Sequence, residues 1–201
     1  LPCDAGPFGA ENRRSVSTGP RKQAQMSCTG RMRITGLSPL TDGLLSSNAG
    51  GYLSRNCVGA GYNCVEVVGR SDELLAIHVT DEGVEFEGVP ELEQATVPEV
   101  TEYMNESRGL EAEHVLCIGP AGENLVRYAS VMTYESRAFG RGGLGAVLGA
   151  KNVKAITFEG DSAPPVDLPE ALQMEVHQKA ATPDTIFRRQ WTTSCTDSIH
   201  D

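Results

Sequence analysis

The chain has 201 residues and a mass of 21.5 kDa, which suits one domain or one domain with an extension. Acidic side chains outnumber basic ones by 27 to 17 and the net charge is −10, so the composition argues against binding to nucleic acid. No apolar run approaches the ~18 residues of a membrane-spanning helix. No secretory signal pattern is present either, and we expect a cytoplasmic protein that binds no membrane.

The charge is unevenly distributed along the chain. Residues 1–71 carry four acids and eight bases, residues 72–113 carry thirteen acids and one base, and residues 114–160 carry three acids and five bases. The two basic stretches are also the Gly-rich ones. Because Gly-rich turns and arginine side chains both bind anions, an anion could be bound where these stretches meet. An acidic, solvated face that happens to lie between them explains the pattern equally well.

The predicted elements begin after a polar stretch of thirty residues without clear periodicity. Alternation predicts a strand over 31–35. The stretch 46–51 is predicted as a loop that opens a short helix through Ala60, with Asn48 as its N-cap. Further strands are predicted over 63–68, 74–79, 84–87, 114–118, 125–132 and 153–158. Further helices are predicted over 98–108, 142–150 and 168–180.

This order of elements predicts an α+β fold, a strand-rich mixed sheet with a few helices. The composition changes at Gly160, after which 161–165 is typical of a linker. We therefore expect one domain over residues 1–160, followed over 161–201 by a linker and the start of a helical domain.

Cysteines and histidines are dispersed and offer no catalytic residue. The six cysteines contain no C-x-x-C pair, so neither a thiolate metal site nor a disulfide framework is predicted. Cys64 and Cys117 lie in apolar, strand-like runs and are predicted to be buried. His78 and His114 lie inside predicted strands and are interpreted as structural.

The densest candidate for binding chemistry is the stretch 136–146, which contains Gly140-x-Gly142-x-x-Gly145 and two arginines. Glycines allow the backbone to approach a ligand closely, and arginines suit a phosphate or a planar polar ring. A dinucleotide site would need a buried strand directly before the glycines and an acidic residue about twenty positions after them. Neither is present, so a nucleotide-binding module is one alternative and a Gly-rich helix packed on a sheet is another.

Several motifs in order resemble the N-terminal domain of the aldehyde ferredoxin oxidoreductase family, whose members are tungsten or molybdenum pterin enzymes. The resemblance extends from about residue 12 to residue 160. It rests on these segments: Gly30-Arg31, 38–41, 47–52, 60–62, 118–127 and 137–154. Residues 13–17 are polar where the family has an apolar strand.

The resemblance implies that tungstopterin, a bis-pyranopterin that holds tungsten or molybdenum, rests on this domain with its phosphates bridged by Mg²⁺. Arg31 would hydrogen-bond the pterin and lie between it and an iron–sulfur cluster. Asn48 and Ala138 would give backbone carbonyls to the Mg²⁺. Three more residues would line the pterin-phosphate pocket: Gly50, Arg137 and Gly140.

The implied reaction oxidises an aldehyde to a carboxylic acid and passes electrons through a 4Fe-4S cluster to ferredoxin. The cluster would be held by later domains of the family, so we expect this chain to be a fragment or one subunit of a split enzyme, inactive alone. Missing C-terminal domains or a complementary subunit would be its partners. The alternative is a truncated, non-catalytic binding or assembly module of the same fold.

Overall fold

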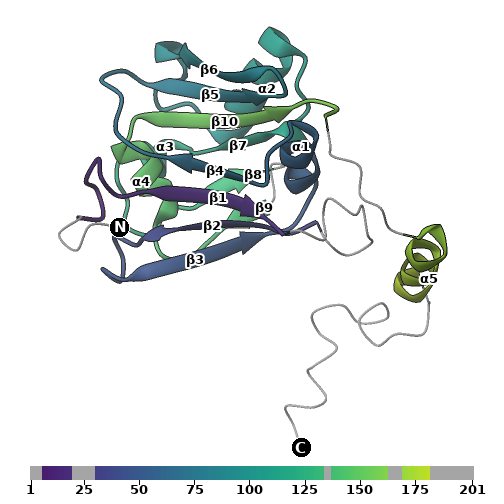
Figure 1. The fold of residues 1–201 in the computed structure, drawn as a ribbon. Coiled ribbons are helices and arrows are strands. Elements are labelled where there is room, and N and C mark those ends of the chain that lie inside the picture. The colour runs from purple at the N-terminus through teal and green to yellow at the C-terminus, as the bar shows by residue number, and fades with distance from the viewer. Residues whose placement is uncertain (1–5, 20–29, 134–136, 163–168, 182–201) are drawn as a thin grey trace, which may run out of the picture.

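Two stacked β-sheets with helices around them form an α+β fold, as predicted (Figure 1). The computed structural model describes residues 6–19, 30–133, 137–162 and 169–181. None of the helices within these ranges is long and apolar enough to cross a membrane.

The first sheet is antiparallel and has the order β3-β2-β1-β4. Its strands are β1 (Arg14–Thr18), β2 (Met32–Leu37), β3 (Leu44–Ala49) and β4 (Cys64–Val67). Buried and exposed residues alternate along β2, so one face of this sheet points to the core and the other points outward.

The second sheet is mixed and has the order β6-β5-β10-β7-β8-β9. Its strands are β5 (Leu75–Thr80), β6 (Gly83–Gly88), β7 (Val115–Cys117), β8 (Val131–Thr133), β9 (Arg137–Phe139) and β10 (Val153–Glu159). β10 pairs with β5 in parallel, and the other pairs are antiparallel.

The main core lies between the two sheets. Met32 and Ile34 from the first sheet pack into one cluster with Ile156 and Phe158 from the second. Helices α1 (Leu53–Gly59) and α4 (Leu144–Ala150) add buried side chains to the same cluster. Burial of this apolar surface is what holds the sheets together.

A second, smaller core lies on the other face of the second sheet, under α2 (Val97–Arg108). Thr96 and Glu99 form a capping box at the start of this helix, and Gly109 ends it with a φ of 70°. The remaining helices are α3 (Pro120–Glu123), α5 (Glu170–Ala181) and the 3-10 turns η2 (Pro90–Leu92) and η3 (Ala112–His114). Figure 1 shows α5 apart from the two sheets.

Most predicted elements are confirmed within one to three residues, and two are wrong. Asn48 does not cap a helix, because it lies in β3 and pairs with Arg33, and α1 begins only after Tyr52. The strand predicted over 125–132 is reduced to β8. Leu125 has a φ of 55° and its amide donates to Gly122, so the chain turns there instead of extending. The start of the helix predicted at residue 168 lies outside the described residues.

Four of the polar residues 13–17 lie in a strand, because β1 spans Arg14–Thr18. β1 is the third strand of the first sheet and pairs with both β2 and β4, which supply its backbone hydrogen bonds. Arg14 is fully buried in it. Cys117 and His78 are buried in strands, as predicted. Cys64 was predicted to be buried but is exposed, and His114 lies in the 3-10 turn η3 instead of in a strand.

Candidate functional site

The six site residues predicted from the resemblance come from two stretches of the chain, 31–50 and 137–140. Arg31 precedes β2, Asn48 is in β3, and Gly50 follows it. The second segment supplies the other three: Arg137 and Ala138 from β9, and Gly140 directly after it.

The structure brings these two segments into contact. β3 and β9 are edge strands of different sheets and lie against each other. The Ser47 hydroxyl donates to the Gly140 carbonyl at 2.7 Å. A Cβ placed on Gly51 would lie 3.8 Å from Cγ of Arg137. The end of β3 and the residues that follow it therefore lie against β9.

A cleft of about 380 Å³ lies on the first sheet and includes two of the predicted site residues, Arg31 and Asn48. It is lined by Ser17, Thr18, Gly19, Arg31, Met32, Arg33 and Asn48. No carboxylate is among these residues, and Arg31 and Arg33 are both exposed. The local charge is therefore positive, which favours an anion.

Arg33 is a cleft residue that the sequence reasoning missed. Its Nε donates to Oδ1 of Asn48 at 3.2 Å. The signal that could have found it is the alternation of the predicted strand, since residues 31 and 33 are two apart and face the same side.

The glycines around this surface fall into two groups. A Cβ on Gly50 would meet no described atom within 4 Å, and one on Gly140 would make ordinary contact with Ser130 Oγ at 3.8 Å. By contrast, Gly143 has a φ of 70° and a Cβ there would clash with the Arg127 backbone. The glycine run therefore contributes one glycine to the open surface, and the later ones pack closely, as the alternative of a Gly-rich packed helix predicts.

The residues present fit a phosphate-bearing cofactor with a bridging cation. Exposed arginines supply charge for phosphate, and Gly50 leaves space for close approach. Asn48 and Ala138 lie on edge strands, where every second backbone carbonyl points away from the neighbouring strand. Carbonyl oxygens are ligands that Mg²⁺ accepts. Among the described residues, no group of three or more His, Cys, Asp or Glu side chains could hold a metal ion.

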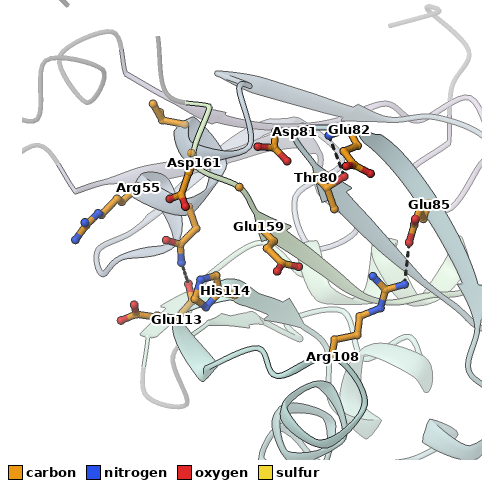
Figure 2. Close-up of a pocket in the computed structure, with 14 residues that line it drawn as sticks. Arg55, Thr80, Asp81, Glu82, Glu85, Arg108, Glu113, His114, Glu159 and Asp161 are labelled. Carbon is orange, nitrogen blue, oxygen red and sulfur yellow. Dashed lines mark hydrogen bonds and ion pairs between the residues drawn. The ribbon is translucent and has the colours of Figure 1, made fainter. Parts of the chain in front are cut away.

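A larger cleft, of about 1010 Å³, lies elsewhere and has the opposite charge (Figure 2). Its carboxylates are Asp81, Glu82, Glu85, Glu113, Glu159 and Asp161. Arg108 donates to Glu85 at 2.9 Å and lowers the pKa of that carboxyl, so Glu85 is ionised at neutral pH. This cleft shares no lining residue with the basic one and would repel an anionic cofactor.

Comparison with known proteins identifies the family that the sequence resembles. The family model described as aldehyde ferredoxin oxidoreductase, N-terminal domain, matches residues 1–160. The tungsten-containing aldehyde ferredoxin oxidoreductase of Pyrococcus furiosus is 34% identical over 173 residues, which cover 86% of this chain and 29% of that protein. The enzyme of the same name from Pyrococcus horikoshii is 38% identical over 154 residues, 77% of this chain and 25% of that protein.

More distant relatives have other names. The aliphatic sulfonate oxidoreductase, WOR-like subunit, of Pyrococcus furiosus is 30% identical, over 84% of this chain and 28% of that protein. Among solved structures, the active site complex BamBC of benzoyl coenzyme A reductase, in complex with 1,5-dienoyl-CoA, matches with a TM-score of 0.83 and 29% identity. That match covers 92% of this chain and 30% of the other.

The chain spans less than a third of the length of the relatives it matches. The match to the family model covers most of it, and both sheets lie within the matched residues. The chain belongs to the aldehyde ferredoxin oxidoreductase family, an enzyme family of oxidoreductases, and matches the N-terminal domain of that family.

Proposed function

We propose that this chain is the cofactor-binding part of an oxidoreductase that converts aldehydes to carboxylic acids with a tungsten or molybdenum bis-pterin. The observation that carries the proposal is the contact between two edge strands, where the segment of Asn48 and Gly50 lies against the segment of Arg137 and Gly140. The names of the relatives support tungsten and an aldehyde substrate. In this proposal residues 1–160 form the cofactor domain, and residues 161–201 lead to a further helical domain.

When bound, the bis-pterin metal centre supplies the two-electron oxidation of an aldehyde and water to a carboxylic acid. The residues of this chain bind and orient it. Arg31 would donate hydrogen bonds to the pterin, and Arg137 would offset phosphate charge. The backbone carbonyls of Asn48 and Ala138 would bind the bridging Mg²⁺. Gly50, like Gly140, would let the backbone approach the phosphates.

Arg31 has a second role in this proposal. Its guanidinium is charged at any physiological pH, and it would lie between the pterin and a 4Fe-4S cluster. A fixed positive charge next to redox centres favours their reduced forms and so raises their potentials. The cluster would be held by later domains of the same polypeptide or by a complementary subunit, and ferredoxin would accept the electrons in the cytoplasm.

The test is the metal and pterin content of the protein purified from its native source, with co-eluting chains identified. The Arg137→Ala variant removes a charge that this proposal places on the phosphates. We expect its tungsten or molybdenum content and its pterin content to fall about tenfold, the effect of losing ~1.5 kcal/mol of charge-assisted hydrogen bonding.

Arg70→Ala is the matched control, since Arg70 is also exposed but belongs to neither β3 nor β9 and to neither segment of the predicted site. Its cofactor content should equal that of the unaltered protein. Equal content in the Arg137→Ala protein would contradict the proposed role of Arg137. A native protein without tungsten, molybdenum or pterin would contradict the function itself and favour the non-catalytic module.

A further inference from the structure

We propose that Arg33 is an additional cofactor-binding residue, whose guanidinium holds the Asn48 side chain and binds a phosphate oxygen of the pterin cofactor. The inference rests on the proposed function, and it extends the site by a residue that the resemblance does not supply. Its basis is the arrangement of three neighbouring strands in the first sheet.

Arg33 lies in the middle of a row of polar residues. In register it pairs with Ser17 of β1 on one side and with Asn48 of β3 on the other. Its neighbours along the strand, Met32 and Ile34, are buried in the core. The row Ser17–Arg33–Asn48 therefore faces outward, and all three residues line the basic cleft.

The contact between Arg33 and Asn48 leaves the row rich in hydrogen-bond donors. Nε of Arg33 donates to Oδ1 of Asn48, so the amide oxygen is occupied and the amide Nδ2 is left as a donor. The two terminal nitrogens of Arg33 bond no described residue and keep the fork that binds two oxygens of one phosphate. With the Ser17 hydroxyl and Arg31 beside them, the cleft presents donors and positive charge without a carboxylate. An oxyanion is the ligand that such a set binds.

The charge of Arg33 is not balanced by a described carboxylate, in contrast to that of Arg13, which directly precedes β1 of the same sheet. Arg13 pairs with Glu66 at 2.9 Å. Arg33 and Arg31 are two residues apart in one cleft, and no ion pair joins either to a described residue. Bringing two like charges together costs free energy unless an anion lies between them, so this pair is suited to a phosphate.

The experiment is a calorimetric titration of the full chain with inorganic phosphate at low ionic strength. We expect Arg33→Gln to weaken phosphate binding about tenfold and Arg13→Gln to leave it within about twofold, because Arg13 is already paired. Thermal unfolding of each variant checks that the fold is kept. No phosphate binding by the unaltered chain, or equal binding by Arg33→Gln, overturns the inference.

A second variant distinguishes bidentate hydrogen bonding by the guanidinium from the effect of positive charge alone. Arg33→Lys keeps the charge, but one ammonium cannot hold Asn48 and grip a phosphate with two parallel bonds. We expect it to bind phosphate at least about threefold more weakly than the unaltered chain. Affinity equal to that of the unaltered chain overturns the role of Arg33 as a bridge to Asn48.

Failure of this inference and failure of the proposed function give different results. If the native protein contains tungsten and pterin but Arg33→Gln binds phosphate as tightly as the unaltered chain, the inference is wrong and the proposed function stands. If phosphate binding depends on Arg33 but the native protein contains no pterin or metal, the anion subsite stands and the function is wrong.

Discussion

Glycine and arginine each occur in two settings in this molecule, an open surface and a packed interior. On the first sheet, Arg33 in β2 is exposed and Gly50, directly after β3, borders open space. Inside the fold, Arg14 is fully buried between the sheets, and Gly145 and Gly149 lie in a helix whose residues are all buried. In the first setting the residue leaves room or charge for a ligand. In the second setting glycine lets two parts of the backbone come close together, and a buried arginine lowers the stability of the fold.

The interior glycines allow backbone to touch backbone. A Cβ on Gly145 would lie 2.8 Å from the carbonyl carbon of Ser130, and one on Gly149 would lie 2.6 Å from that of Gly122. Both neighbours are main-chain atoms, which cannot move aside as the tip of a side chain can. The close approach of α4 to α3 and to the segment before β8 therefore requires glycine at both positions.

The largest effect on stability is expected at Gly149. In an isolated helix, replacing glycine by alanine stabilises by up to about 1 kcal/mol. Here the added methyl group would clash with the Gly122 backbone, so we expect Gly149→Ala to lower the free energy of unfolding by about 3 kcal/mol. Urea unfolding followed by circular dichroism measures it.

The control for this prediction is Gly61→Ala, which adds the same methyl group where no described atom lies within 4 Å. Its φ is 86°, so a loss of about 1 kcal/mol from backbone strain alone is expected. A Gly149→Ala protein as stable as the unaltered chain would show that α4 does not pack on α3 in this way.

The cost of a buried arginine can be tested at Arg14. Its Nη2 donates to the Leu37 carbonyl at 2.5 Å, but its Nε and Nη1 have no hydrogen-bond partner among the described residues. Burial lowers the pKa of this guanidinium to about 10. Because an unpaired buried polar group costs about 1–3 kcal/mol, we expect Arg14→Leu to raise the free energy of unfolding by about 1–2 kcal/mol.

The neighbouring Arg13 provides the contrast. Arg13→Leu removes an exposed ion pair with Glu66, so stability should fall by less than about 1 kcal/mol. The two leucine variants should therefore change stability in opposite directions. A large loss in Arg14→Leu would instead mean that the guanidinium stabilises the core, and the two arginine settings would no longer differ as described.

Local signals predicted the elements that local interactions stabilise. Pro98 in the first turn, the acidic residues that follow it and the terminal Gly109 predict α2 within one residue of its observed start. β1 was not predicted, because its alternating serines and buried Arg14 give no apolar pattern. Its pairing with β2 and β4 depends on contacts that are distant in sequence.

The candidate site also contains residues that the sequence indicates and one that only the structure shows. Its six predicted residues come from the family resemblance and not from composition or spacing. The structure shows that their two segments meet. Strand alternation places Arg33 on the same side as Arg31, but its contact with Asn48, fifteen positions away, is a cross-strand pair. Single-chain patterns do not reveal which residues lie opposite each other across a sheet.

The smallest effect on stability is expected at Gly50. A substitution there should change the cofactor content far more than the free energy of unfolding. A methyl group there meets no described atom, and the φ of Gly50 is not in the left-handed region. We therefore expect Gly50→Ala to change the free energy of unfolding by less than about 0.5 kcal/mol. In the native protein the same methyl group would project into the space proposed for the pterin phosphates, so tungsten and pterin content should fall severalfold. Reduced stability with full cofactor content would reverse both expectations, and Gly50 would then be a packing glycine like Gly149.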